Sequence, residues 1–193
     1  MPRTKAAAVT SDTRTTLLRA AAAEFNEHGY AGTDTNRIAR RAGFAPQTFY
    51  RWYTDKLTVF IAAYQGWVET ERELISSLLE RNASNQQLAA AVVGHHREFL
   101  KFRRSLRQLS VEEKSVRVAR AESRKRQIAQ IRLWKQTEAD ESELAVSLLQ
   151  MERLADALAE GEFKDMGVSS RAGENALARL IEQLKGKMNG VDR

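Results

Sequence analysis

The sequence contains no cysteine, only two prolines and no long apolar run. The absence of cysteine excludes disulfides, thiolate nucleophiles and cysteine-ligated zinc or iron–sulfur sites. The two prolines, Pro2 and Pro46, leave nearly all of the 193 residues free of helix breakers. Segments in which Val, Ile, Thr and aromatic residues alternate with polar ones are also missing, although they are the usual sign of strands. These absences predict an all-α fold.

The chain also lacks the segments that direct a protein to a membrane. Residues 1–12 contain no apolar core of signal-peptide length, and no run of about 18 apolar residues follows. We therefore expect no membrane partner and a cytoplasmic location.

Recognisable catalytic patterns are missing as well. We find no Ser/His/Asp order, no glycine-rich phosphate loop, no paired-carboxylate motif and no cluster of metal ligands. His95 and His96 are adjacent, and neighbours on a helix point about 100° apart, so they rarely share a metal. We expect both to be ordinary core or surface residues. The sequence predicts neither an enzyme nor a bound metal or cofactor.

The net charge is +6, and its distribution is uneven. Residues 1–60 hold nine Lys/Arg and five Asp/Glu, whereas residues 97–135 hold thirteen and four. Residues 136–193 are acidic, with seven basic and twelve acidic side chains. The basic stretch 97–135 has three interpretations: a solvated face paired with the acidic C-terminal segment, a cavity for an anionic metabolite such as an acyl-coenzyme A, or an accessory DNA contact.

The spacing of apolar residues predicts a series of helices along the chain. Their expected ranges are 13–28, 34–42, 46–52, 56–81, 86–109, 110–136, 143–159 and 171–187. Thr33 and Asp55 are the expected N-caps of the second and fourth helices, and Ser110 to Glu113 forms a capping-box pattern. We divide the chain into a disordered arm (1–13), an N-terminal domain of three helices (14–55) and a larger helical domain (56–193).

A helix-turn-helix is predicted at about residues 34–53. Gly43 lies between two short helices, where glycine can adopt a left-handed turn without a Cβ clash. Ile38, Ala39 and Phe49 are placed to face inward. Such a unit inserts its second helix into the DNA major groove.

The exposed positions of that second helix are candidate DNA contacts. Gln47 can bond adenine in a bidentate manner, and the methyl group of Thr48 can meet thymine. Tyr50 and Arg51 lie one turn later and can reach phosphates or a base. Lys56 and Thr33 stand at the starts of helices, where free backbone N–H groups favour a phosphate. Arg37 and Pro46 complete the candidate set.

With these residues in place, the sequence resembles the TetR family of bacterial regulators. The resemblance runs from Arg14 to about Phe60. It includes an Arg-x-x-Leu-Leu-x-x-Ala-Ala opening, Phe25, Gly29-Tyr30, Thr33, Ile38-Ala39, Ala42-Gly43, Thr48-Phe49-Tyr50, Tyr53 and Lys56. The resemblance implies a homodimer that binds palindromic operator DNA and is released by a small-molecule ligand. It also implies that Thr33, Tyr50 and Lys56 contact phosphates, with Gln47, Thr48 and Arg51 at or beside base-reading positions.

The chain departs from the family pattern at two points. Ala45-Pro46 stands where a Ser cap and a variable residue are common, so the recognition helix is expected to lack a side-chain cap. Lys56-Leu57 replaces the usual Lys-acidic pair.

Beyond Phe60 the resemblance is limited to length and helical pattern, and the site residues there are predicted from position. The candidate ligand pocket comprises Tyr64, Trp67, His96, Phe99, Ile131, Trp134 and Met151. The candidate dimerisation stripes comprise Leu144, Leu148, Met151, Leu154, Leu158, Leu177, Leu180, Ile181 and Leu184. These stripes also fit simple packing within one protomer. A protein of the TetR fold that makes helical interactions without a small-molecule inducer remains the alternative function.

Overall fold

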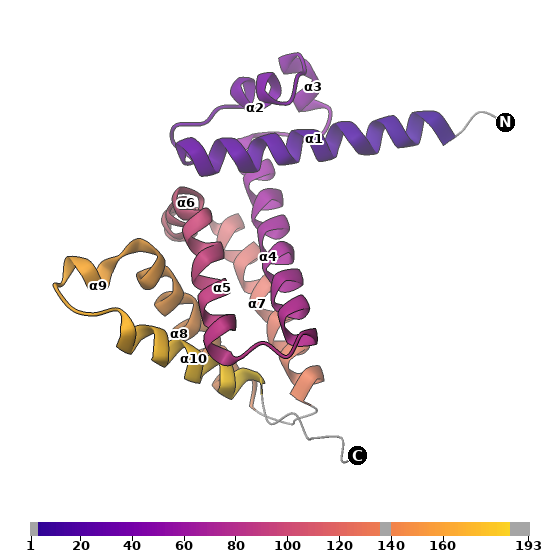
Figure 1. Ribbon diagram of the computed structural model, residues 1–193. Coiled ribbons are helices and arrows are strands. Elements are labelled where there is room, and N and C mark those ends of the chain that lie inside the picture. The colour runs from indigo at the N-terminus through magenta and orange to yellow at the C-terminus, as the bar shows by residue number, and fades with distance from the viewer. Residues whose placement is uncertain (1–3, 136–139, 186–193) are drawn as a thin grey trace. The chain divides into compact units, whose positions relative to one another are not determined.

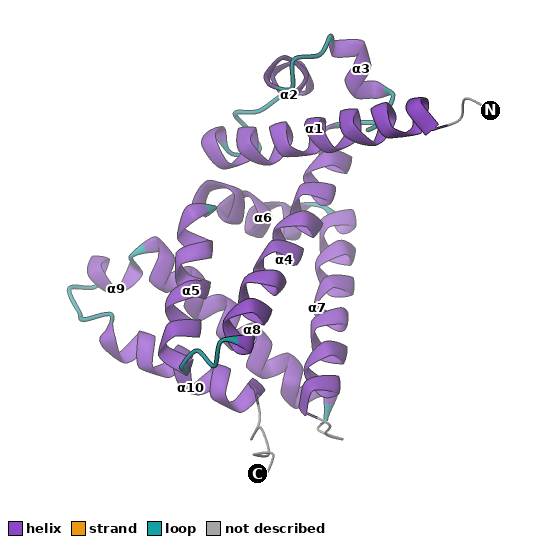
Figure 2. Cartoon of the chain, turned by 45° about the vertical axis from the view of Figure 1, so that its right-hand side comes forward, coloured by secondary structure: helices purple, strands orange, loops and turns teal. Residues whose placement is uncertain are grey.

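The computed structural model describes residues 4–135 and 140–185, and all regular elements in these residues are helices, which confirms the all-α prediction (Figures 1 and 2). The helices are α1 Thr4–His28, α2 Thr35–Arg41, α3 Pro46–Tyr50, α4 Lys56–Glu80, α5 Asn85–Glu98, α6 Leu100–Glu112, α7 Lys114–Lys135, α8 Glu141–Glu160, α9 Glu162–Asp165 and α10 Arg171–Lys185.

The chain forms two compact units. The first contains residues 1–68 and 101–116, and the second contains residues 69–100 and 117–193. The first unit therefore includes α1 to α3, the first half of α4 and nearly all of α6. Residues 101–116 group with the N-terminal helices because α6 makes specific contacts there. The Phe102 ring, for example, lies 4.9 Å from that of Phe60.

Helix α1 begins at Thr4, so residues 4–12 are helical and not the disordered arm expected from the sequence. The segment contains three successive alanines, which have the highest helix propensity. No glycine or proline interrupts the chain between Thr4 and His28, so nothing in the sequence ends the helix before Gly29.

An aromatic cluster forms the centre of the first unit. The Phe25 ring packs edge-on against Phe60, with centroids 5.0 Å apart, and Tyr30 contacts both rings. Ile38 and Phe49, from α2 and α3, are fully buried as predicted. The two short helices are thereby anchored through their apolar faces, which leaves their polar faces outward.

The second unit is built around α5, α8 and α10, which pack against one another in pairs (Figure 1). Its core is made of small and aliphatic side chains from these helices, with Leu88, Ala155 and Leu177 at or near zero exposure. A smaller cluster joins Ile131 of α7 to Leu144 of α8 and Leu184 of α10.

Three differences between the predicted helices and the structure have a clear local cause. The predicted helix 86–109 is divided at Phe99, whose φ of −109° and ψ of 34° leave the helical region. The predicted capping box at Ser110 does not form, because α6 continues to Glu112 and the Ser110 Oγ donates to the carbonyl of Arg107. Thr33 is not the cap of α2, since Asp34 Oδ1 accepts the Arg37 N–H at 2.8 Å instead.

Among residues 4–135 and 140–185, no helix combines the length and the hydropathy needed to cross a lipid bilayer.

Candidate nucleic-acid interface

The turn between α2 and α3 has the geometry predicted for a helix-turn-helix. Gly43 has a φ of +76°, a left-handed conformation that side-chain-bearing residues rarely adopt. No atom lies within 4 Å of a Cβ built there, so the backbone conformation and not crowding favours glycine. Pro46 occupies the start of α3, and the N-cap Ala45 makes no side-chain bond, as expected.

Helix α3 presents one buried and one exposed face. Phe49 is fully buried, whereas Pro46, Gln47 and Arg51 are exposed and Thr48 is half-buried. Tyr50 is 57% exposed, although its ring packs edge-on against Phe49. The residues predicted to contact DNA from α3 therefore share one outward surface.

Tyr50 also connects α3 to the beginning of α2. Its hydroxyl lies 3.0 Å from Thr35 Oγ1, and Thr35 is the first residue of α2. The pair places two hydroxyl groups beside the N-terminus of a helix, where anions are favoured. Sequence reasoning missed Thr35, because nothing in the sequence indicates which residue fifteen positions away meets Tyr50.

Lys56 lies at the start of α4, as predicted, but its ammonium group is bonded within the protein. The Nζ donates to the carbonyls of Tyr30 at 2.9 Å and Thr33 at 3.0 Å, and it lies 4.0 Å from the Tyr30 ring centroid. Burial lowers the pKa of Lys56, and the nearby Asp34 carboxylate partly opposes this effect. The ammonium thus holds the α1–α2 loop and has one remaining N–H for an outside partner.

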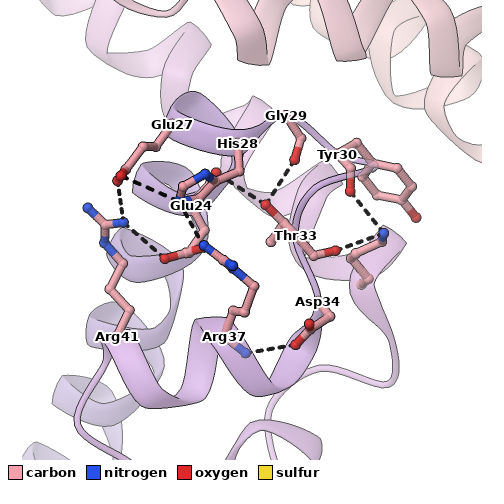
Figure 3. Close-up of polar contacts among 10 residues, drawn as sticks. Glu24, Glu27, His28, Gly29, Tyr30, Thr33, Asp34, Arg37 and Arg41 are labelled. Carbon is pink, nitrogen blue, oxygen red and sulfur yellow. Dashed lines mark hydrogen bonds and ion pairs between the residues drawn. The ribbon is translucent and has the colours of Figure 1, made fainter.

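Thr33 lies in that same loop and is only 2% exposed. Its hydroxyl donates to the carbonyl of Gly29 at 2.8 Å and approaches that of Glu24 at 3.2 Å (Figure 3). The structure therefore separates the Thr33 side chain from the exposed surface of α3.

A cluster of ion pairs joins α1 to α2 (Figure 3). Glu24 Oε2 accepts Arg37 Nε at 3.0 Å, and Glu24 Oε1 accepts Arg41 NH1 at 3.0 Å. Glu27 accepts a second bond from Arg41 at 2.7 Å. Arg37, a predicted DNA contact, is thus bound to an acid of α1.

Helix α6 contacts the end of α1 within the first unit. Lys101 Nζ donates to the carbonyl of Glu27 at 2.7 Å, which satisfies one of the open acceptors in the last turn of α1. Ser105 Oγ accepts the Tyr30 N–H at 2.9 Å. These contacts fix the loop that Lys56 also holds.

The predicted ligand-pocket residues come from both units. Tyr64 and Trp67 belong to the first unit, and Trp67 lies under the buried guanidinium of Arg103 at 4.6 Å. His96, Phe99, Ile131 and Met151 belong to the second unit, and the side chain of Trp134 lies outside the described residues.

His96 is buried between two carboxylates. Its Nδ1 lies 2.8 Å from Asp156 Oδ1, and its Nε2 lies 3.1 Å from Glu71 Oε1. Within the described residues, no group of three or more His, Cys, Asp or Glu is arranged to hold a metal ion.

Most of the predicted dimerisation residues pack inside their own unit. Leu144, Leu148, Leu158, Leu177, Ile181 and Leu184 are buried, while Met151, Leu154 and Leu180 are half-buried. An apolar surface does exist nearby, on the outer side of α8, α9 and α10. A hollow of about 550 Å³ is lined there by Leu149, Gln150, Arg153, Leu154, Ala157, Glu162, Phe163, Met166 and Leu180.

Several cations of the stretch 97–135 pair with the acidic C-terminal segment. Arg120 and Arg124 both bind Glu152 of α8, at 2.5 and 2.6 Å, and Arg132 binds Glu141 at 2.7 Å. These pairs support the first of the three interpretations, a basic face compensated by acidic neighbours.

Comparisons with known proteins identify the N-terminal part of the chain. Residues 17–63 match the family model described as bacterial regulatory proteins, tetR family. YdgC of Bacillus subtilis (strain 168), an uncharacterized HTH-type transcriptional regulator, is 32% identical over 76 residues; the alignment covers 39% of this chain and 39% of YdgC.

Two solved structures share the fold over most of the chain. A protein from Rhodococcus sp., described as a TetR-family transcriptional regulator, superposes with a TM-score of 0.66 at 20% identity, covering 91% of this chain and all of that one. FadR of Bacillus subtilis, solved in complex with stearoyl-CoA, superposes with a TM-score of 0.54 at 18% identity, covering 86% of this chain and 96% of that one. The helix-turn-helix thus lies in a segment, residues 17–63, that matches the tetR family of bacterial regulatory proteins, and the chain shares its fold with both solved structures.

Proposed function

We propose that this protein is a one-component transcriptional repressor, which binds palindromic operator DNA as a homodimer and leaves the DNA when a small molecule binds. The observation that supports DNA binding most strongly is the outward face of α3. Gln47, Tyr50 and Arg51 are exposed there on a helix whose opposite side is anchored by the fully buried Phe49. A rigid helix with exposed polar groups is what major-groove reading requires.

We divide the contacts into base-reading and positioning groups. Gln47 and Thr48 meet base edges near the start of α3, while the paired hydroxyls of Tyr50 and Thr35 offer a phosphate the hydrogen that is not used in the bond between them. Lys56 adds its third N–H and its charge. The Thr33 hydroxyl is left out of this set because it is bonded to carbonyls inside the loop.

The proposed dimer forms through the outer side of α8 and α10. Leu149 and Met166 are 47% and 64% exposed beside the apolar hollow, although leucine and methionine usually lie in protein interiors. An isologous interface would bring two copies of this surface together and would bury these side chains. Such a dimer presents two α3 helices to an inverted repeat.

The proposed ligand site lies in the helical second unit. Because Arg120 and Arg124 already bind Glu152, an anionic ligand would have to compete with that carboxylate for them. The fold shared with a protein that was solved with stearoyl-CoA makes long-chain acyl-coenzyme A thioesters the first compounds to test.

Electrophoretic mobility shift with DNA from upstream of the protein's own gene and its neighbours tests the proposal. We expect a sequence-selective complex at moderate salt. A compound that stabilises the protein in a thermal-shift screen should dissociate this complex. If no selective complex forms, the repressor proposal is wrong, and the alternative of a helical interaction protein is favoured. If a selective complex forms but no stabilising compound releases it, only the ligand part of the proposal fails.

A further inference from the structure

Glu24 is a buried acid that receives two arginines of the helix-turn-helix. It lies on α1, is only 5% exposed, and each of its two carboxylate oxygens accepts one guanidinium N–H at 3.0 Å, from Arg37 and Arg41 (Figure 3). Both arginines come from α2 and remain partly open to solvent, with side chains 38% exposed. The cluster thus joins a buried anion to cations at the surface.

Electrostatics keep Glu24 ionised. Burial by itself would raise its pKa, but hydrogen bonds and charges from Arg37 and Arg41 outweigh this effect, so the pKa falls below the usual value. At neutral pH the carboxylate therefore offsets part of the positive charge of α2. The third arginine of that helix, Arg40, is exposed and makes no ion pair within the described residues.

We infer that Glu24 acts as a charge clamp, which withholds Arg37 and Arg41 from DNA phosphates and thereby limits sequence-independent binding by the helix-turn-helix. The inference rests on the proposed DNA-binding function and changes the role of Arg37, which the sequence suggested to be a direct contact. Sequence-independent affinity is set mainly by the number of neutralised phosphates. A regulator gains selectivity when fewer of its cations are available for such contacts, because base-specific bonds then make a larger share of the total.

The neighbouring Glu27 shows why burial matters. It also binds Arg41, but its side chain is 54% exposed and both partners face solvent. Exposed ion pairs exchange readily with water and salt and contribute little. A phosphate can replace Glu27 as a partner of Arg41 at a small cost in free energy. Moving Arg37 and Arg41 to phosphates costs more, because the buried Glu24 carboxylate would lose both of its guanidinium partners.

The salt dependence of binding to an arbitrary duplex tests the clamp. We would titrate the full chain onto a fluorescent 30-base-pair duplex of random sequence and measure the slope of log K against log[salt]. Glu24→Gln keeps the size and a hydrogen-bond acceptor but removes the negative charge. We expect its slope to steepen by about 0.9 for each released arginine that meets a phosphate, so a fourfold rise in salt costs it about three- to fourfold more affinity per contact.

Three further variants make the result specific. Glu73→Gln changes the net charge equally on an exposed part of α4 and should leave the slope unchanged. Arg37→Gln alone should also leave it nearly unchanged, because the clamp already withholds that charge. In the Glu24→Gln background, Arg37→Gln should bring the slope back toward the wild-type value. Circular dichroism at the same salt concentrations verifies that each variant is folded.

Two results would overturn the clamp. One is a folded Glu24→Gln variant with the wild-type slope, which would show that Glu24 stabilises the fold without affecting DNA binding. The other is a shallower slope for Arg37→Gln alone, which would show that Arg37 already contacts phosphate; this second result decides the question even if Glu24→Gln fails to fold. A wild-type chain that binds no duplex at low salt would overturn the proposed function and the inference together.

Discussion

Tyr53 follows α3 with a side chain that is only 3% exposed, and its ring is tilted by 39° against that of Phe49, with the centroids 5.7 Å apart. Within the described part of the chain, its buried hydroxyl has no hydrogen-bond partner. A buried polar group without a partner costs its full desolvation energy. The ring therefore supports the recognition helix while the hydroxyl weakens the fold.

We predict that Tyr53→Phe leaves the free energy of unfolding unchanged or raises it by about 1 kcal/mol, because it removes the unpartnered hydroxyl and keeps the ring. Urea denaturation followed by circular dichroism measures this. Tyr50→Phe is the matched control: it should change stability little but weaken DNA binding, since its hydroxyl lies beside Thr35 on the exposed face. A loss of more than 1 kcal/mol in Tyr53→Phe would contradict the account of Tyr53.

Several residue roles could be predicted from the sequence because they depend on local pattern. The turn at Gly43, the buried Ile38 and Phe49 and the exposed Gln47 all follow from helical spacing. The partners of Glu24 and His96 could not be predicted, since they lie 13 to 60 residues away and only the folded chain brings them together. Nor could Thr33 be distinguished from Asp34 as the cap of α2, because both residue types cap helices well.

At the scale of single elements, α4 starts from a cap that the sequence did predict. Asp55 Oδ1 accepts the Thr58 N–H at 2.7 Å, and this bond is the main reason that the pKa of Asp55 is lowered. The cap satisfies an N–H group that the helix cannot satisfy itself. It also fixes the first turn of α4, from which Lys56 holds the α1–α2 loop.

Asp55→Ala should lower the free energy of unfolding by about 1 kcal/mol at pH 7. Because the folded pKa lies below the unfolded one, the charge contribution is fully present above about pH 4 and is lost as the pH falls through the folded value. The difference between wild type and variant should therefore shrink below about pH 4. Urea denaturation at pH 7 and at pH 3.5 measures it, and a difference that grows on acidification would contradict the capping role.

Element boundaries beyond the helix-turn-helix were harder to predict. The break at Phe99 has no glycine or proline to indicate it, and it arises where α6 turns to pack Phe102 and Leu106 into the first unit. The capping-box pattern at Ser110 was a false indication, because α6 continues through it. Both errors occur where packing between distant segments, and not local sequence, determines the backbone.

At the scale of the whole molecule, the chain crosses between its two units within α4, at the start of α6 and within α7. Residues 101–116 lie near the middle of the sequence, and because of these crossings they belong to the unit that holds the helix-turn-helix. Sequence pattern could not show this grouping, because the apolar face of an amphipathic helix does not indicate which unit it will pack against. As a result, α6 contacts the end of α1 through Lys101 and the α1–α2 loop through Ser105.

Self-association is the property that the whole chain must show if the proposal is correct. We predict that Leu149→Glu, on the outer face of α8, converts a dimer to a monomer, because a charge in an apolar interface is costly. Sedimentation equilibrium measures the mass. Val118→Glu introduces the same charge at a comparably exposed apolar residue of α7 and should leave the dimer intact. A Leu149→Glu variant that stays dimeric would place the interface elsewhere.

The central claim is that the exposed face of α3 reads DNA sequence, and selection of binding sites from a randomised duplex library tests it most directly. We predict that the wild-type chain enriches an inverted repeat, and that Gln47→Ala keeps the repeat but loses preference at one position of each half-site, worth about 1–3 kcal/mol. Enrichment of no sequence by the folded wild-type chain, or an unchanged preference in a folded Gln47→Ala variant, would contradict it.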